Sequence, residues 1–243
     1  WNPYERNHWG YMTTFFFAPE SYYASDGTDI PGSWNGIDGR SIDEIKGMVK
    51  AFHKKDIAVI MDVVYNHVSN YDWNPLKYID RGMYFRLDEN DDYIAHSGCG
   101  NDTRSEHPKM QQLILESLKY WMIEYHVDGF RFDLGNLIDK DTRQKIHAEL
   151  KAINPHVILL AEPWGNGYDP DGFSDMGWAS FNDQFRDGLK GNVFDVETIV
   201  EGMDYFDDNG SGAVSLEGAY LSLNAPIIVA TQGTIDQLSS DNI

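Results

Sequence analysis

Three short apolar runs alternate with helical patterns along the chain, and this alternation constrains the fold more than any other feature. The runs have the length and the β-branched or aromatic content of buried strands: 57–64 (IAVIMDVV), 127–134 (VDGFRFDL) and 157–164 (VILLAEPW). The helical patterns lie before and between them: 41–55, 105–125 and 142–153. Elements that alternate in this way form a parallel sheet with crossover helices. The sequence therefore predicts an α/β fold, either a doubly wound sheet or a (β/α)8 barrel.

Local signals predict where two of the helices begin. Ser41 and Glu44 have the spacing of a capping box, which places the start of the first helix at Ser41. Ser105 is predicted to cap the second helix, because Pro108 then falls in the first turn.

The rest of the chain is less regular. The segment 68–104 is rich in Tyr, Asp, Asn and Gly and is too long for a simple connection, so we expect a functional loop or a small subdomain there. Further strands are predicted at 179–185 and 225–231.

The composition of the chain limits the kinds of molecule that the protein could bind. The formal net charge of −20 leaves little positive charge to neutralise phosphates, which excludes a nucleic-acid partner and suits a neutral ligand. No apolar stretch has the length of a membrane span and no signal-peptide pattern opens the chain. We therefore expect a soluble protein with no membrane partner, cytoplasmic or secreted with a leader missing from this sequence. Aromatic residues make up 14% of the chain, which suits a surface that stacks on carbohydrate rings.

Two of the predicted strands end in a carboxylate, Asp133 and Glu162, and such charges are costly at the ends of apolar strands unless they have a role. Arg131 lies two residues before Asp133, so both side chains share one face of the strand, and the guanidinium favours the ionised carboxylate. Pro163 and Trp164 give Glu162 apolar neighbours, which would raise its pKa. Two carboxyl groups shifted in opposite directions are the arrangement of a nucleophile and a general acid.

Polar residues also accompany other predicted strands. Asp62, Asn66 and His67 lie on or just after the first strand, and Asn182 and Asp183 lie on the strand predicted at 179–185. A site assembled from the carboxyl ends of several successive strands is typical of a (β/α)8 TIM barrel. This distribution favours the barrel over the doubly wound sheet.

The same segments resemble the signatures of the α-amylase family of retaining glycoside hydrolases. DVVYNH (62–67) is similar to the first signature, GFRFDL (129–134) to the second and AEPW (161–164) to the third. AEPW, NHWGYMT, FAPESYYAS and GCGND resemble the debranching enzymes within the family, and the similarity extends from about residue 7 to about residue 195. GCGND followed by SEHP favours type I pullulanase, whereas WGYMT favours isoamylase.

The resemblance implies three catalytic residues. Asp133 would be the nucleophile, Glu162 the acid/base, and Arg131 the partner that holds Asp133 ionised. In the retaining mechanism, Glu162 protonates the leaving oxygen while a glycosyl ester forms on Asp133. Water activated by Glu162 then releases the sugar.

Four further residues are implied to bind the substrate: Tyr11, His67, Asp62 and Trp164. Tyr11 would stack beneath the sugar at the cleavage subsite, and His67 would hydrogen-bond that sugar. Asp62 suits a buried ion pair with Arg131 and a direct contact with the ligand equally well.

The implied chemistry needs no cofactor, and we assign no metal ligand. Calcium is the one cation with candidate ligands. Asn66 matches a calcium ligand of many amylases, although debranching enzymes often lack that site. A run of acidic residues has the composition of a hard-cation cluster, but a solvated acidic surface is the commoner explanation: Asp88, Glu89, Asp91 and Asp92.

The sequence departs from the family in one respect. The third acidic residue of the family belongs to a His-Asp pair on the seventh strand, and no His-Asp pair occurs in this chain. The segment 225–236 does not match, so Asp236 is not assigned this role. We expect residues 1–243 to form one partial catalytic domain that holds about strands 3 to 6 of a barrel. An open barrel exposes strand edges, so the isolated chain is expected to be poorly soluble and inactive.

The resemblance implies an α-glucan debranching hydrolase that cleaves α-1,6 links in pullulan, glycogen or amylopectin. Two alternatives remain open at this point. One is an α-1,4-acting amylase or a branching transferase of the same family. The other is a non-catalytic glucan-binding or interaction protein with a degenerate barrel, which the missing third acid favours and the intact Asp133, Glu162 and Arg131 oppose.

Overall fold

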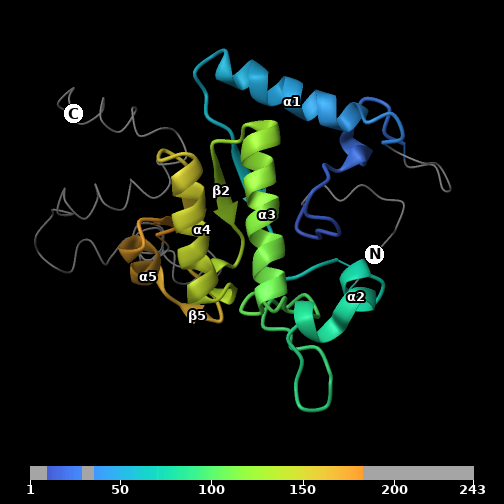
Figure 1. Ribbon diagram of the computed structural model, residues 1–243, viewed down its shortest axis with the longest axis vertical. Coiled ribbons are helices and arrows are strands. Elements are labelled where there is room, and N and C mark those ends of the chain that lie inside the picture. The colour runs from blue at the N-terminus through green and yellow to red at the C-terminus, as the bar shows by residue number, and fades with distance from the viewer. Residues whose placement is uncertain (1–9, 29–35, 70, 183–243) are drawn as a thin grey trace, which may run out of the picture. The chain divides into compact units, whose positions relative to one another are not determined.

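The computed structural model describes residues 10–28, 36–69 and 71–182 (Figure 1). The chain divides into two compact units, 1–169 and 170–243. The second unit is described only over its first residues, which form the helix α5 (Pro170–Asp175) and the short strand β6 (Ala179–Ser180). β6 lies within the strand predicted at 179–185, and the strand predicted at 225–231 lies outside the described residues.

Three parallel strands form the sheet of the first unit in the order β1, β2, β3. They are β1 (Ile60–Val63), β2 (Gly129–Phe132) and β3 (Ile158–Ala161). Each lies inside one of the predicted apolar runs and is shorter than the run, so the predicted α/β fold with a parallel sheet is confirmed. The register places Asp62 beside Arg131.

The described residues of the first unit form the α-helices α1 (Arg40–His53), α2 (Pro75–Tyr84), α3 (Pro108–Tyr125) and α4 (Lys140–Ile153). α3 and α4 lie side by side in front of β2 in Figure 1. Their buried apolar side chains form the core together with two fully buried residues of β2: Met110, Ile114, Leu118, Ile146, Leu150, Phe130 and Phe132. The face of β2 that carries both phenylalanines is therefore the buried face, and Arg131 lies on the other.

The predicted helix starts are wrong at two positions. α1 begins at Arg40 with Gly39 as its N-cap, and Glu44 accepts hydrogen bonds from the amide and hydroxyl of Ser25 rather than closing a capping box. α3 is capped by His107, whose side chain accepts from the amide of Lys109.

The residue predicted to cap α3, Ser105, is fully buried and has partners elsewhere. Its hydroxyl accepts from Arg86 Nη2 at 3.2 Å and from the amide of Asp139 at 3.0 Å. In both cases a residue of the predicted capping signal, Glu44 or Ser105, instead binds partners that are distant in the sequence.

The segment 68–104 has structure of its own. It contains α2 and two isolated antiparallel bridges, Phe85 with Thr103 and Leu87 with Tyr93. The fully buried carboxylate of Asp102 accepts from the backbone and ring of His96 and from the amide of Ser97. The amide of Thr103 donates to the carbonyl of Asn66 at 2.9 Å, which holds the end of this segment beside the chain just after β1.

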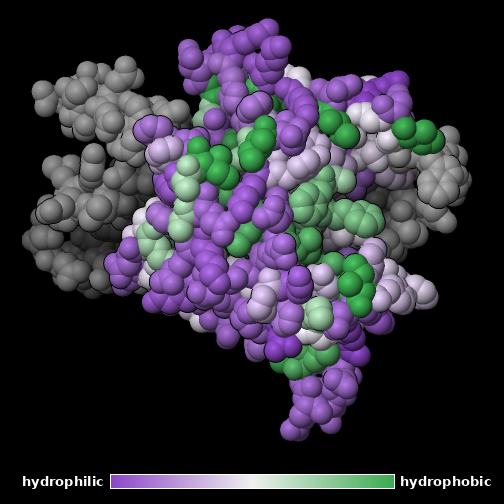
Figure 2. Space-filling view, viewed as in Figure 1, coloured by the Kyte–Doolittle hydropathy of each residue, from purple (hydrophilic) through white to green (hydrophobic). Residues whose placement is uncertain are grey.

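The face shown in Figure 2 is mostly hydrophilic, and apolar side chains form several small patches on it. Among the apolar residues of α1, Val49 is buried, whereas Ile42, Met48 and Phe52 are exposed. Over the described ranges, none of the helices combines the length and the apolar content that a membrane crossing needs.

Candidate active site

Arg131 contacts three carboxylates at the carboxyl edge of the sheet. Its Nη1 lies 2.9 Å from Asp62 Oδ1 and 3.2 Å from Asp133 Oδ1, and its Nη2 contacts Glu162 Oε1. The side chains of Arg131, Asp133 and Glu162 are each only 14% exposed. One guanidinium therefore gathers Asp62 and the two residues predicted to be the nucleophile and the acid/base.

The sheet itself places these residues. The amide of Asp133 donates to the carbonyl of Val63, and the amide of Glu162 donates to the carbonyl of Phe132, both at 3.0 Å. The hydrogen bonds of the parallel ladder thus continue one residue past each strand. Because Arg131 and Asp133 are two residues apart, they lie on one face, as predicted.

Asn66 fixes the second oxygen of Asp133. Its Nδ2 donates to Asp133 Oδ2 at 2.9 Å and to the backbone carbonyl of Asp133 at 2.8 Å. The sequence suggested Asn66 only as a calcium ligand, and its contact with Asp133 was missed. Both oxygens of the predicted nucleophile therefore accept a hydrogen bond, which fixes the direction in which the carboxylate points.

Leu134 supplies a backbone donor to Glu162. Its amide donates to Glu162 Oε2 at 2.9 Å. Its φ of 41° lies in the left-handed region, which residues other than Gly and Asn rarely adopt. The strand therefore ends before Leu134, although the apolar run predicted that it continued. The turn directs the Leu134 amide at Glu162, a contact that no sequence pattern indicated.

Burial raises the pKa of Glu162 above that of an ordinary glutamate, and the charge of Asp133 adds to this effect. The Leu134 amide and Arg131 act in the opposite direction without reversing it. The direction predicted from sequence is thus confirmed. Burial would lower the pKa of Arg131, but the Asp62 and Glu162 carboxylates outweigh it and raise that pKa.

Tyr11 lies against the same cluster. Its hydroxyl donates to Asp62 Oδ2 at 2.8 Å, and the guanidinium carbon of Arg131 lies 5.6 Å from the centre of its ring. The Asp62 side chain is 46% exposed, so its pair with Arg131 is not a buried ion pair. Tyr11 and Asp62 therefore form the more open side of the site.

His67 is only 1% exposed. Its Nδ1 lies 2.6 Å from Asn66 Oδ1, and its Nε2 lies 2.9 Å from the backbone carbonyl oxygen of Tyr11. Burial lowers the pKa of His67, which favours the neutral ring. Both neighbours are carbonyl oxygens, so a neutral ring can donate a hydrogen bond to only one of them. The contact of His67 with a sugar stays a prediction.

Trp164 lies two residues after Glu162 on a small antiparallel hairpin of β4 (Trp164–Gly165) and β5 (Gly167–Tyr168). It is half-buried and pairs across the hairpin with Tyr168, which is 41% exposed. The structure thus brings Asp62, Arg131, Asp133, Glu162 and Tyr11 into direct contact and places Trp164 in the adjoining loop.

The acidic run suggested as a cation cluster forms a turn. Asp88 Oδ1 accepts from the amides of Asn90 and Asp92, at 2.8 and 2.9 Å. Within the described part of the chain, no three His, Cys, Asp or Glu side chains are grouped in a way that could hold a metal ion.

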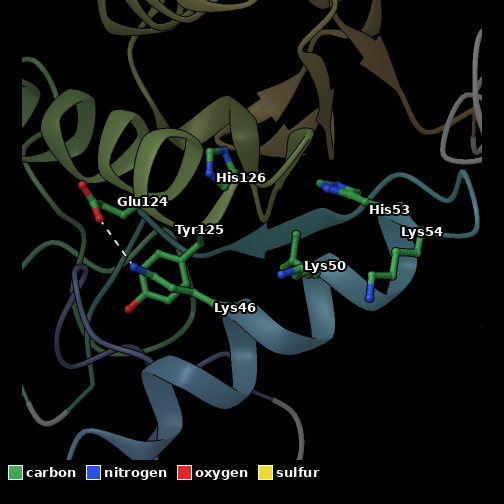
Figure 3. A pocket seen from close by; sticks show the side chains of 8 residues that line it. Lys46, Lys50, His53, Lys54, Glu124, Tyr125 and His126 are labelled. Carbon is green, nitrogen blue, oxygen red and sulfur yellow. Dashed lines mark hydrogen bonds and ion pairs between the residues drawn. The ribbon is translucent and has the colours of Figure 1, made fainter.

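A hollow of about 650 Å³ lies between α1 and the end of α3 (Figure 3). Its lining contains none of the seven residues predicted for the site: it consists of Lys46, Val49, Lys50, His53, Lys54, Glu124, Tyr125 and His126. Because α1 and α3 end where β1 and β2 begin, this hollow lies at the amino edge of the sheet. The carboxylates around Arg131 lie at the opposite, carboxyl edge.

Comparison with known proteins supports the predicted resemblance, although no protein-family model matches the chain. The chain is 39% identical over 202 residues to the chloroplastic isoamylase 3 of Oryza sativa subsp. japonica, a match that covers 76% of the chain and 25% of that protein. The solved pullulanase of Bacillus acidopullulyticus is 41% identical with a TM-score of 0.69, over 77% of the chain and 23% of its own.

A third relative is the type I pullulanase of Bacillus subtilis, solved in complex with maltose. It is 34% identical with a TM-score of 0.70, over 78% of this chain and 27% of its own. The chain therefore spans about a quarter of the length of the relatives it matches. Together with the three signatures and the carboxylates around Arg131, these matches show that the chain is part of an α-amylase-family protein, similar to relatives that are named isoamylase and pullulanase.

Proposed function

We propose that the protein is a retaining α-glucan debranching hydrolase that cleaves α-1,6 links in pullulan, glycogen or amylopectin. One observation carries the proposal: Arg131 holds an ionisable pair, Asp133 and Glu162, at one edge of a parallel sheet, and burial raises the pKa of Glu162. Maltose bound to the related pullulanase of Bacillus subtilis supports a glucan as the ligand.

In the proposed reaction Asp133 attacks the anomeric carbon of the sugar as Glu162 gives its proton to the glycosidic oxygen. The bond to that oxygen breaks, and the first sugar remains as an ester on Asp133. Glu162, now ionised, takes a proton from water, and the resulting oxygen displaces Asp133. Two inversions leave the product in the configuration of the substrate.

Five residues around the pair are proposed to act by contact or orientation. Asp62 and Arg131 hold the carboxylates in place, Tyr11 stacks on the sugar, and His67 lies behind the site. Trp164 binds the substrate from the hairpin after Glu162. We further propose that the chain contributes about strands 3 to 6 of a (β/α)8 barrel, as part of one catalytic domain.

An assay with two polymers tests the linkage. The protein expressed from the complete gene is expected to release reducing ends from pullulan, whose maltotriose units are joined by α-1,6 links, and much more slowly from amylose, which has only α-1,4 links. NMR of the first product should show the α-anomer, as retention requires. Hydrolysis of amylose alone would indicate an α-1,4-acting amylase, and new branches without new reducing ends would indicate a transferase.

Tyr11→Ala is expected to lower kcat/KM for pullulan by about tenfold or more, because an aromatic contact contributes about 0.5–1.5 kcal/mol beyond its buried area. Tyr11→Phe is the matched control, since it keeps the ring and removes only the hydroxyl, which donates to Asp62 and accepts from Arg131 Nη1. Its loss should be smaller. Equal losses would show that the hydroxyl matters rather than stacking, and unchanged kinetics in Tyr11→Ala would remove Tyr11 from the cleavage subsite.

A further inference from the structure

Two loops of the site contact each other beside the predicted catalytic pair. The nucleophile turn (134–137) follows Asp133 and contains the 3-10 helix η2 (Gly135–Leu137), and the β4–β5 hairpin (164–168) begins two residues after Glu162. Asn136 joins them, because its Nδ2 donates to the carbonyl of Asn166 at the hairpin tip, 2.7 Å away. A hairpin with two residues in each strand is not stable alone, so outside contacts determine its position.

Two glycines bring the backbone of the hairpin close to this turn. Gly165 and Gly167 have φ values of 128° and 87°, which side chains disfavour. A Cβ on Gly165 would lie 2.9 Å from Leu137 Cγ, too close for a real contact, and one on Gly167 would lie 3.5 Å from Asn136 Nδ2. The hairpin therefore packs directly on the nucleophile turn.

Arg143 of α4 holds the other end of the Asn136 amide. Its Nη1 donates to Asn136 Oδ1 at 3.4 Å and lies 4.0 Å from Asp169 Oδ2, one residue past the hairpin. The Arg143 side chain is only 7% exposed. The base of the hairpin is closed by the Asp169 amide, which donates to the carbonyl of Pro163 at 2.8 Å. These contacts fix the orientation of the Asn136 side-chain amide, with Oδ1 toward Arg143 and Nδ2 toward the hairpin.

We propose that Asn136 is a positioning residue that determines where the β4–β5 hairpin lies. This hairpin in turn binds the sugars on the leaving-group side of the cleaved bond. The second part rests on the proposed function. Glu162 protonates the leaving oxygen, and the hairpin follows Glu162 directly in the chain. It carries Trp164 and Tyr168, whose aromatic rings suit stacking on sugar faces. Asn136 acts only through the hairpin.

Asn136→Asp in the protein from the complete gene tests this role. The change keeps the shape of the side chain and its partner Arg143, but it replaces the donor to Asn166 with a charged oxygen, so an attraction becomes a repulsion. We expect KM for pullulan to rise about tenfold. We expect kcat/KM for an aryl maltotrioside, whose leaving group is a single ring, to stay within about twofold. Asn90→Asp is the matched control, because Asn90 is exposed in the turn before Tyr93.

Hydrogen exchange provides a readout that does not depend on activity. Backbone amides in peptides spanning 163–169 should exchange faster in Asn136→Asp than in the wild type or in Asn90→Asp. Asn136→Ala, which removes the donor without adding a charge, serves if Asn136→Asp does not fold. Equal loss on both substrates would assign Asn136 to the reaction centre or to folding, and unchanged exchange would show that it does not position the hairpin. A wild-type protein inactive on every glucan would refute the proposed function, while exchange would still decide the positioning role.

Discussion

Asp133→Asn is expected to abolish hydrolysis of α-1,6-glucans while glucan binding persists. The change removes the charge that attacks the anomeric carbon, and loss of a nucleophile lowers turnover by about 10⁴-fold or more. The two oxygens of Asp133 accept from Arg131 Nη1 and Asn66 Nδ2, so the new amide must turn its own NH₂ toward one of these donors. One hydrogen bond is lost in either orientation, but the sheet and the other carboxylates stay.

Asp141→Asn is a matched control, because Asp141 is an exposed carboxylate in the first turn of α4 that pairs with Lys145. Reducing-end release measures turnover, and calorimetric titration with a maltooligosaccharide measures binding. Activity near that of the wild type would show that Asp133 is not the nucleophile. Loss of both binding and the folded state would instead indicate a structural role.

Much of the sheet and of the Arg131 cluster was predictable from the sequence, because both depend on short-range periodicity. Each strand lies in an apolar run that only a buried strand explains, and the spacing of Arg131 and Asp133 fixes a shared face. Parallel strands end at one edge, which is why Glu162, a residue past β3, meets a side chain of β2.

The parts that were mispredicted depend on contacts between distant residues. Ser41 and Glu44 have the right spacing for a capping box, yet Glu44 binds Ser25 and α1 begins at Arg40 after its N-cap, Gly39. Asn66 contacts Asp133 across 67 positions of the chain. No local pattern specifies such partners, because they follow from how the sheet brings strand ends together.

The backbone contributes a second kind of contact that side-chain patterns do not specify. The amide of Leu134 reaches Glu162 only because Leu134 is in the left-handed conformation, where a leucine is uncommon. Likewise, Gly165 and Gly167 matter for the space they leave beside the nucleophile turn. Asn66 is only 1% exposed, and a buried polar side chain needs a partner, but that burial becomes visible only in the folded structure.

Glu162→Gln is expected to separate substrates by their leaving groups. Hydrolysis of natural glucosyl links should fall by about 10³-fold or more, because the departing sugar needs a proton and general acids contribute about 10²–10⁴-fold. An activated aryl glycoside leaves without protonation, so its first step should persist. The ester on Asp133 then lacks a base to activate water, and azide, which needs none, should speed the second step and give a glycosyl azide.

The pH dependence gives an independent test of the same residue. Glu162 must carry its proton to act as the acid, so kcat/KM for pullulan should fall as pH rises through its pKa. Because burial raises the pKa of Glu162, this fall should occur at higher pH than an ordinary glutamate would give. In Glu162→Gln, the residual activity on the aryl glycoside should lack this alkaline fall. If both substrates lose activity equally, azide has no effect and the alkaline fall persists, another group donates the proton.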